Sequence, residues 1–356
     1  MGKVYRHLYP QVTDWDNLLL AWAKARKGKR GYPPAATFEH NAGENLLALQ
    51  TALQHKTYQP GPYASFYIHE PKRRLISAAP FTDRVVHHAL CNIMEPLFNR
   101  RFIHDSYANR KGKGTHAAID RCQKFARRYT YVLQADVQQF FPAIDHALLL
   151  DAIRGLIVDP DLLWLCETIL ESGRGVLNQE YDMVYFPGDN LLAALRPRGL
   201  PIGNLTSQFW ANVYLNQFDH FVKRELKCKA YLRFVDDLLL FADDKTTLWR
   251  WRAAIIDFLA ALRLTLHEKR CHPNLVTEGI PFLGFRVFPT HRRLKSRKGF
   301  AFRHRLRQQL ADYQAGKISL SQVDASVQGW VNHVRYGQTY GLRRKMFRTM
   351  PIRPPQ

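Results

Sequence analysis

Apolar residues recur along this chain with two different spacings, and each spacing predicts one type of element. Recurrence every three to four residues predicts amphipathic helices. Such segments run from Thr13 to about Lys27, Phe38 to Gln54, Thr82 to Phe98, Thr115 to about Arg128, Asp145 to Ile157, Asp161 to Ser172, Phe209 to Leu226 and Thr246 to Leu262, and a helical C-terminal part contains Trp330. The pattern alone therefore predicts a chain dominated by helix.

Short apolar or alternating runs predict strands. They lie at Phe66 to Glu70, Arg74 to Ala78, Tyr129 to Val137, in both halves of Ala230 to Ala242, at Leu264 to Leu266 and within Pro281 to Phe288, while Gly173 to Arg198 is looser with hairpin features. From Tyr129 onward the predicted order is the β-α-β-β-α-β arrangement of a ferredoxin-like sheet. We therefore expect an α+β fold divided into residues 1–128, 129–289 and 290–356.

An acidic pair, Asp236 and Asp237, lies at the predicted tip of the hairpin within Ala230 to Ala242. Asp is a common turn residue, so the pair alone predicts little beyond a turn. The next pair, Asp243 and Asp244, precedes a predicted helix and is better explained as a strand-to-helix turn with an N-cap. The first pair therefore holds the position of interest.

A third acid, Asp136, ends the strongest predicted strand. In a ferredoxin-like sheet this strand lies beside the hairpin, so Asp136 is expected to face Asp236. Carboxylates this close repel one another and are tolerated mainly around divalent cations. Oxygen ligands favour Mg²⁺, and two such ions about 4 Å apart suit a phosphoryl displacement. The pattern predicts a site for two Mg²⁺ ions.

Charge then narrows the class of partner. The chain has 52 Lys and Arg against 30 Asp and Glu among 356 residues, a net charge of +22, with 46% hydrophobic and 12% aromatic residues. This apolar content excludes a disordered chain, and the excess charge favours a polyanion such as nucleic acid over solubility alone. Cationic segments occur in the turn Pro71 to Arg73, in the loop Asn109 to Thr115 and from His291 to Arg307.

Cysteine usage and the N-terminal sequence favour a soluble, cytoplasmic protein with no membrane contact. The five cysteines are Cys91, Cys122, Cys166, Cys228 and Cys271; they form no Cys-x-x-Cys pair and fall mostly within apolar periodic segments, as expected of reduced core residues. His267, Cys271 and His272 lack a fourth zinc ligand at matching spacing. No signal-type or membrane-spanning apolar run is present in the sequence.

Five segments resemble, in order and spacing, the successive palm motifs of reverse transcriptases. They are Asp136 with Phe141, Gly199 to Gln208, Phe234 to Asp237, Leu264 to Lys269, and Phe282 to Phe285. Upstream, Arg74 to Ala78 with Asp83 to Val86, and Ser106 to Arg110 with Gly114 to His116, resemble fingers motifs of the bacterial enzymes. The resemblance implies a right-hand polymerase, with N-terminal helices and fingers over 1–128, the palm over 129–289, and a basic segment with a short helical thumb over 290–356.

The resemblance also implies roles for individual residues. Asp136 and Asp236 would share the metal ions, with the Val137 carbonyl as a further ligand and Asp237 as the third catalytic carboxylate. Phe234 departs from the family, which usually has Tyr there; the ring is kept, so activity is still expected. Further expected roles are triphosphate binding by Lys72 and Arg74, rejection of a ribose 2′-hydroxyl by Phe141, contact with the nascent base pair by Ile202 and Gly203, proton donation to pyrophosphate by Lys269 or Arg270, backbone binding by Arg110, Lys111 and Lys113, and a primer grip at Phe282 and Gly284.

Within the family, the loop Gly199 to Gln208 looks most like the enzymes of diversity-generating retroelements, which copy RNA with errors opposite adenine. The implied function is error-prone, RNA-directed DNA synthesis with dNTPs, an RNA template, a DNA or RNA primer and a small basic accessory protein as partners. The short segment after the palm leaves no room for an RNase H or endonuclease domain, which argues against an intron maturase. Two alternatives stay open: a related reverse transcriptase of antiviral defence, and a catalytically silent RNA-binding scaffold.

Overall fold

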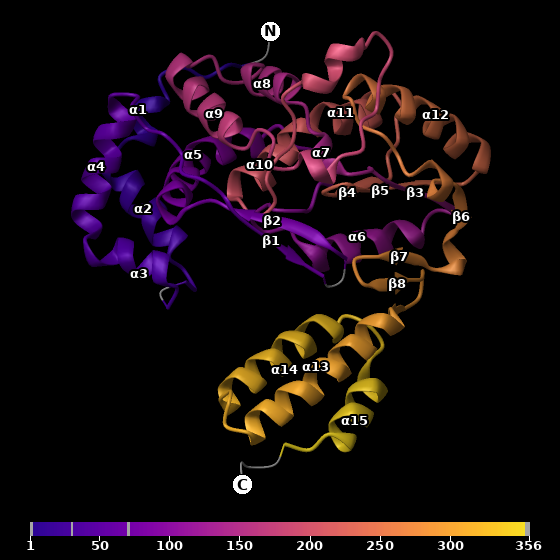
Figure 1. The fold of residues 1–356 in the computed structure, drawn as a ribbon. Helices are drawn as coiled ribbons and strands as arrows, with labels where there is room; N and C mark the ends of the chain where they lie inside the picture. Colours follow the sequence, from indigo (N-terminus) through magenta and orange to yellow (C-terminus); the bar gives the residue numbers. More distant parts are fainter. Residues whose placement is uncertain (1–2, 30, 70–71, 353–356) are drawn as a thin grey trace.

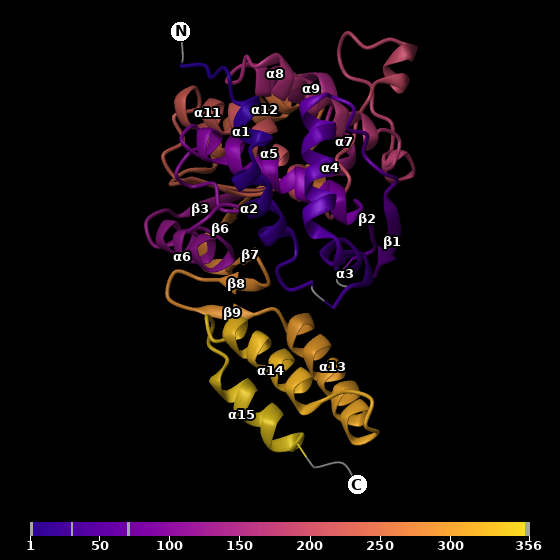
Figure 2. The ribbon, with the colours of Figure 1, turned by 90° about the vertical axis from the view of Figure 1, so that its left-hand side faces the viewer.

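The computed structural model describes residues 3–29, 31–69 and 72–352. An upper region of helices surrounds a central sheet, and a second, helical lobe hangs below it, joined through a small sheet (Figure 1). The same lobe projects from the rest of the molecule in the perpendicular view (Figure 2). The fold is α+β, as the sequence predicts.

The N-terminal part consists of five helices and one hairpin. The helices are α1 (Tyr9–Val12), α2 (Trp15–Ala25), α3 (Pro33–His40), α4 (Ala42–Gln54) and α5 (Phe81–Asn99). The expected single helix over Phe38 to Gln54 is wrong, because the backbone leaves helical geometry at Asn41 (φ −121°, ψ 46°). The long helix α5 is the centre of this part, and α2 packs along it.

The predicted hairpin forms from β1 (Ala64–Ile68) and β2 (Arg74–Ala78), which pair in antiparallel register from Ala64 with Ala78 to Ile68 with Arg74. Of its predicted cationic turn, Lys72 and Arg73 are described, whereas Glu70 and Pro71 lie outside the described residues.

The central sheet has four antiparallel strands in the order β4-β5-β3-β6. They are β3 (Tyr131–Asp136), β4 (Tyr231–Phe234), β5 (Asp237–Ala242) and β6 (Pro273–Leu275). Numbered from β3, this is the order second-third-first-fourth, which is that of a ferredoxin-like sheet. The expected topology is therefore confirmed, and it places β3 directly beside β5.

The last strand of this sheet is not the one that the sequence predicts. Leu264 to Leu266 does not form a strand; Leu266 makes an isolated bridge with Val137, directly after β3, and β6 forms the edge of the sheet instead. Leu264 and Leu266 are apolar because they are buried in the core, 1% and 2% exposed. At the edge, Pro273 costs no ladder hydrogen bond if its missing N–H faces outward.

One helix, α6 (Thr115–Ala126), precedes the first strand of this sheet, and the following helices connect its strands. The connecting helices are α7 (Phe140–Ala143), α8 (His146–Arg154), α9 (Pro160–Ser172), α10 (Leu205–Tyr214), α11 (Asn216–Arg224) and α12 (Lys245–Ala261). The expected helix over Phe209 to Leu226 is divided at Leu215. Gly173 to Arg198 forms two 3₁₀ turns (Asn178–Glu180 and Leu191–Leu195) in irregular chain rather than the expected hairpin features. Two further 3₁₀ turns, Glu268–Arg270 and Val276–Glu278, flank β6.

A three-stranded sheet joins the two lobes. It consists of β7 (Ile280–Phe282), β8 (Phe285–Val287) and β9 (Arg292–Leu294), in that order. The β7–β8 hairpin is the one predicted within Pro281 to Phe288, whereas β9 lies in the basic segment and was not predicted. Helices α13 (Ser296–Gln314), α14 (Leu320–Val334) and α15 (Tyr340–Thr349) form the lower lobe, and Trp330 packs inside it against Phe302.

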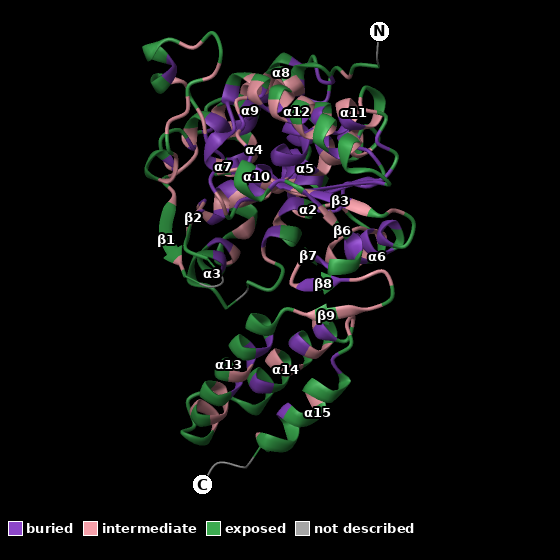
Figure 3. Ribbon diagram, turned by 90° about the vertical axis from the view of Figure 1, so that its right-hand side faces the viewer, coloured by how far each residue is buried: buried purple, intermediate pink, exposed green. Residues whose placement is uncertain are grey.

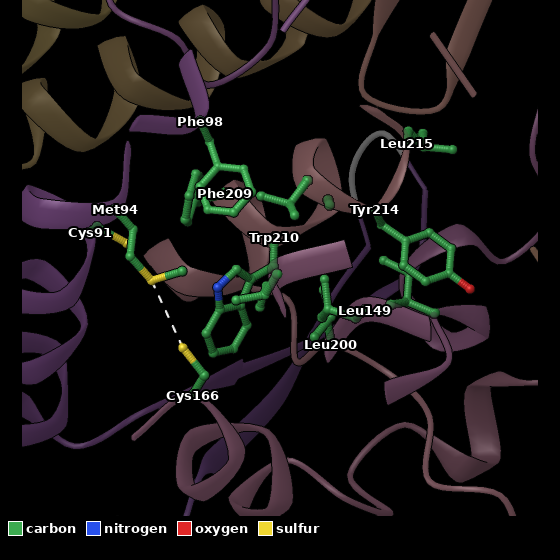
Figure 4. Packing of buried hydrophobic residues seen from close by; sticks show 14 of the residues in the cluster. Cys91, Met94, Phe98, Leu149, Cys166, Leu200, Phe209, Trp210, Tyr214 and Leu215 are labelled. Carbon is green, nitrogen blue, oxygen red and sulfur yellow. Dashed lines mark hydrogen bonds between the residues drawn. The ribbon is translucent and has the colours of Figure 1, made fainter. Parts of the chain in front are cut away.

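Most buried residues gather in the upper region, while the lower lobe has a thin core (Figure 3). Around Trp210 of α10, side chains from α5, α8 and α9 meet, and the Cys166 thiol lies 3.8 Å from the Met94 sulfur (Figure 4). All five cysteines are free and buried, as predicted. Among the described residues, no helix is long and apolar enough to cross a membrane.

Candidate active site

The acidic pair lies at the tip of the β4–β5 hairpin. Phe234 pairs with Asp237 across the hairpin, so only Val235 and Asp236 form the turn. Val235 has a positive φ of 56°, which a β-branched residue adopts only where its surroundings impose it. On the other side of β5, Asp136 pairs with Asp237. Neighbouring strands thus bring Asp136, Asp236 and Asp237 together, but the strand partner of Asp136 is Asp237 rather than the predicted Asp236.

A buried ion pair holds this tip in place. Arg233 is 0% exposed and donates through Nε and Nη2 to the two carboxylate oxygens of Asp219, at 2.8 and 2.7 Å. Its Nη1 donates to the Val235 carbonyl and to Asn212, both at 3.0 Å. One guanidinium therefore ties the strained turn residue to α10 and α11.

Repulsion between the carboxylates appears in their pKa values. Burial and the charge of Asp136 raise the pKa of Asp236 to about 6. Burial, followed by the charges of Asp236 and Asp136, raises the pKa of Asp237 to about 7. At neutral pH Asp237 therefore carries a proton in part of the molecules, and a divalent cation would displace it.

The donor set fits a hard cation such as Mg²⁺, because it consists of carboxylate oxygens and one main-chain carbonyl. The bridge between Val137 and Leu266 takes its hydrogen bonds from the flanking residues, Gln138 to Thr265 and His267 to Asp136, so this bridge does not use the Val137 carbonyl. Within the described residues, no three His, Cys, Asp or Glu side chains already form a ligand set. Metal binding would therefore require the carboxylate side chains to turn toward a common point.

These pKa values predict how pH changes the stability of the metal-free protein. A pKa raised in the folded state gives stability below the unfolded value, near 4, that is lost as pH rises through about 6 to 7. Buried His87 and partly buried His88, whose pKa values are lowered to about 3 and about 4, act in the opposite direction over the same range. The contribution of the two carboxylates is therefore the difference in melting temperature in EDTA between wild type and a variant without them, and it should fall between about pH 5 and about pH 8. Added Mg²⁺ should raise the wild-type melting temperature more at the higher pH, because it binds the ionised carboxylates.

This melting experiment uses a double variant, Asp236→Asn with Asp237→Asn, and a control variant, Asp324→Asn. Relative to wild type, the double variant should gain melting temperature in EDTA as the pH rises from about 5 to about 8, and it should lose the Mg²⁺ effect. Asp324 is an exposed acid on α14, far along the chain from the site, and its replacement should change neither. A Mg²⁺ effect of the same size at both pH values would contradict the assignment.

Cations surround the three carboxylates on two sides. Lys72 and Arg74 at the β1–β2 hairpin are close enough to lower the pKa of Asp236 against the effects that raise it. Lys269 and Arg270 line a cavity of about 450 Å³ together with Asp136 and Asp237. Lys72 and Arg74 thus lie on one side of the carboxylates, as triphosphate binding would require. Lys269 and Arg270 lie on the other side and stay alternatives as the proton donor to pyrophosphate. These roles remain predictions.

The loop Gly199 to Gln208 is fastened to β2. The Ile202 carbonyl accepts from Ser77 N at 2.8 Å, and the buried Asn204 side chain bonds the main chain of Ala79 and Ser77. Gly203 has a φ of +120°, and a Cβ there would lie 3.0 Å from Ile76 Cγ2. Only glycine therefore fits this contact between Ile202 and the fingers hairpin.

Phe141 lies on α7, directly after β3, and is half-buried with its ring edge-on to Phe140. Its carbonyl accepts from Leu200 N at 2.9 Å, which ties it to the same loop. Phe141 and Ile202 are thus on connected segments, and their roles toward the nucleotide remain predictions.

The basic loop before α6 is more ordered than its sequence indicates. The Arg110 guanidinium donates to Asn99 Oδ1 and to the carbonyls of Ile103 and Ser106, at 2.8 to 3.0 Å. Arg110 therefore acts as a structural anchor, which revises its expected role at phosphates. Lys113 donates to the His104 carbonyl, and Lys111 is exposed. Of the three residues predicted to bind the nucleic-acid backbone, Lys111 and Lys113 therefore stay the main candidates.

The predicted primer grip also needs revision. Phe282 is 1% exposed and lies in the core with Phe285, so its ring cannot touch a primer in this conformation. The turn residues Leu283 and Gly284 have φ of 45° and 91°, the geometry of a tight two-residue hairpin. Contacts from this hairpin would come from the main chain around Gly284.

Two residues at the site were not predicted. His267 Nε2 lies 4.0 Å from Asp136 Oδ2. Lys295, between β9 and α13, lines the cavity with Asp136 and Asp237 and lowers the pKa of Asp237. No local pattern separates Lys295 from the other cations of the basic segment, because only the fold brings it to the carboxylates.

The comparison with protein families decides what this geometry belongs to. The family described as reverse transcriptase (RNA-dependent DNA polymerase) matches residues 68–287, more than half of the 356 residues. The chain belongs to this family. The reverse transcriptase domain thus includes all three carboxylates and the loop that contains Ile202. It also includes strand β2 and the β7–β8 hairpin.

Curated relatives of the reverse transcriptase domain include intron proteins. Group II intron-encoded protein LtrA of Lactococcus lactis subsp. cremoris is 26% identical over 235 residues, covering 64% of this chain and 37% of the relative. Nuclear intron maturase 1, mitochondrial, of Arabidopsis thaliana is 26% identical and covers 50% of this chain and 28% of the relative. Protein YkfC of Escherichia coli (strain K12) is 28% identical and covers 52% of this chain and 47% of the relative. The chain thus spans less than half the length of these relatives.

Among solved structures, telomerase from Candida albicans in complex with a fragment of telomeric RNA superposes with a TM-score of 0.46 and 11% identity. The match covers 83% of this chain and 57% of the telomerase chain. A superposition this loose carries no residue-level argument.

Proposed function

We propose that the chain is an RNA-directed DNA polymerase that extends a primer on an RNA template with deoxynucleoside triphosphates. One observation carries the proposal: Asp136, Asp236 and Asp237 lie together on adjacent strands of a reverse transcriptase domain, with the pKa values of the last two raised to about 6 and about 7. Polymerisation needs such a concentration of carboxylates, which otherwise only costs stability. A catalytically silent scaffold gives no reason to keep it.

Each group would contribute a defined part of the reaction. Asp136, Asp236, Asp237 and the Val137 carbonyl would hold two Mg²⁺ ions, which when bound lower the pKa of a primer hydroxyl and stabilise charge on the leaving oxygen. Lys72 and Arg74 would bind and orient the triphosphate. Lys269 or Arg270, in the cavity beside the carboxylates, would hold a proton for the departing pyrophosphate.

For the biological role we propose error-prone cDNA synthesis for a diversity-generating retroelement. The support is the sequence from Leu200 to Gln208, which has Ile202 on a loop bonded to the fingers strand β2. A second candidate is a group II intron reverse transcriptase, favoured by the similarity to LtrA and to the nuclear intron maturase. A small basic accessory protein is expected as a partner only in the first case.

One experiment tests both levels. The purified protein is given an annealed DNA primer on an RNA template, all four dNTPs and Mg²⁺, and the products are sequenced. We expect RNA-dependent extension that EDTA abolishes, with errors concentrated opposite template adenines. Absence of extension with several primers would contradict the polymerase proposal. Extension with errors spread evenly over the four bases would contradict the retroelement role and favour the intron-type enzyme.

A further inference from the structure

Lys295 occupies the junction between the small sheet and the lower lobe. It follows β9 directly and precedes Ser296, the first residue of α13. Its main-chain N–H donates to the Gly284 carbonyl at 3.0 Å, which holds it against the turn of the β7–β8 hairpin. Lys295 therefore has a fixed backbone position between β9 and α13, at the base of the lower lobe.

From this position the Lys295 side chain reaches the catalytic cavity. It lines the cavity of about 450 Å³ on whose wall Asp136 and Asp237 lie. The other cations there come from two different elements, Arg286 from β8 and Lys269 with Arg270 from the 3₁₀ turn before β6. The cavity thus contains acids together with cations contributed by three separate segments.

The charges of this cavity do not balance once the acids are engaged. Lys269, Arg270, Arg286 and Lys295 carry four positive charges, against three negative charges on Asp136, Asp237 and Glu278. When divalent ions take up Asp136 and Asp237, only Glu278 is left as a counter-charge for the four cations. They then form a site for an anion of several charges, and phosphate oxygens are the matching ligand in a nucleic-acid enzyme.

Aromatic packing fixes the lobe that carries Lys295. The rings of His116 on α6 and Tyr336 after α14 stack at 3.6 Å, with 9° between their planes. His333 of α14 lies 5.0 Å from the Phe285 ring, and a Cβ at Gly284 would be 3.5 Å from His333 Nε2. The turn that binds Lys295 is thus packed against α14.

An ion pair adds to this docking. Arg292 of β9 donates through Nη2 to Asp120 at 2.6 Å and through Nε to Gln123 at 2.9 Å, both on α6. Its carbonyl accepts from Gln338 N at 2.8 Å. The strand that leads into Lys295 is therefore held on both sides, so the lysine is presented to the cavity by a rigid support rather than by a free linker.

We propose that Lys295 is a phosphate-binding residue of the active site, contributed by the base of the thumb to the cavity that contains Asp136 and Asp237. The inference rests on the proposed polymerase function. The phosphate belongs either to the backbone of the primer near its 3′ end or to the incoming nucleotide. The side chain binds it as a point charge, without a covalent step.

The test compares Lys295→Ala, Lys295→Arg and the control Lys317→Ala. Lys317 is an exposed lysine in the turn between α13 and α14, outside the cavity. Two affinities are measured without catalysis: that for a primer–template duplex with Ca²⁺ and no dNTP over a salt series, and that for a dNTP added with Ca²⁺ to the duplex complex, followed by thermal shift. The melting temperature of each free variant serves as a folding check, and an exposed lysine should change it little.

If Lys295 binds the primer, Lys295→Ala should weaken duplex binding about tenfold and reduce the slope of log affinity against log salt by about one. If it binds the nucleotide, the dNTP affinity should fall instead. In either case Lys295→Arg should keep most of the affinity and Lys317→Ala all of it. Unchanged affinity for both ligands in Lys295→Ala would overturn the inference. Failure of the wild-type protein to bind any duplex would instead contradict the proposed function.

Discussion

Replacing Asp236 by alanine is expected to abolish nucleotide incorporation without unfolding the protein. The side chain is the proposed ligand shared by both metal ions, and losing about 4 kcal/mol of transition-state stabilisation already lowers the rate roughly a thousandfold. In the metal-free protein this carboxylate has a pKa raised to about 6, so its charge opposes folding at neutral pH. The variant should therefore melt at the wild-type temperature or above it in EDTA.

The neighbouring acidic pair supplies the matched control. The Asp244 side chain accepts from Thr247 N as the N-cap of α12, and Asp243 accepts from Thr130 N at 3.2 Å. Asp244→Ala should therefore lower the melting temperature slightly and leave incorporation unchanged. Primer extension and thermal melting of both variants give opposite patterns if the assignments are right. Incorporation by Asp236→Ala at the wild-type rate would rule out the metal site.

The centre of the site was predictable because its signals are local. Two apolar runs around Asp236 and Asp237 specify the hairpin, and the strand that ends at Asp136 is long and apolar. The ferredoxin-like order then leaves one arrangement of these strands. Pattern and topology are therefore sufficient to bring the three carboxylates together.

The errors have a common physical cause, which is that residue type does not show what a side chain will contact. Leu264 and Leu266 have the apolar pattern of a strand, but they are buried by packing, and Pro273 to Leu275 takes the edge of the sheet. Phe282 was assigned to the primer, yet the tight turn pairs it with Phe285 and directs both rings into the core. Arg110 has the charge for a phosphate contact but donates its N–H groups to its own loop.

The position of Lys295 was beyond sequence reasoning for the same reason. The basic segment from His291 to Arg307 contains many cations of equal local appearance. One of them reaches Asp237 only because β9 adds to the β7–β8 hairpin and Arg292 docks on α6. Such contacts between distant segments decide function but leave no periodic trace.

The other large effect is expected from Arg233, which binds no substrate. Arg233 and Asp219 are both 0% exposed, and Tyr231 also donates to Asp219, at 2.7 Å. Removing one partner leaves a buried charge unpaired, which typically costs 3 to 5 kcal/mol, so Arg233→Met should lower the free energy of unfolding by about 4 kcal/mol. Denaturant unfolding measures it directly, with exposed Arg250→Met as a control expected within about 0.5 kcal/mol of wild type.

A double variant separates stability from function at this position. Arg233→Met with Asp219→Leu removes both charges and should recover much of the lost stability, since a buried pair contributes little beyond its own desolvation cost. The Val235 carbonyl would still lose the 3.0 Å hydrogen bond from Arg233 Nη1 that fixes the strained turn. Activity should therefore stay well below wild type in the restored protein, because Asp236 follows that turn. A double variant with recovered stability and full activity would show that the ion pair serves folding alone.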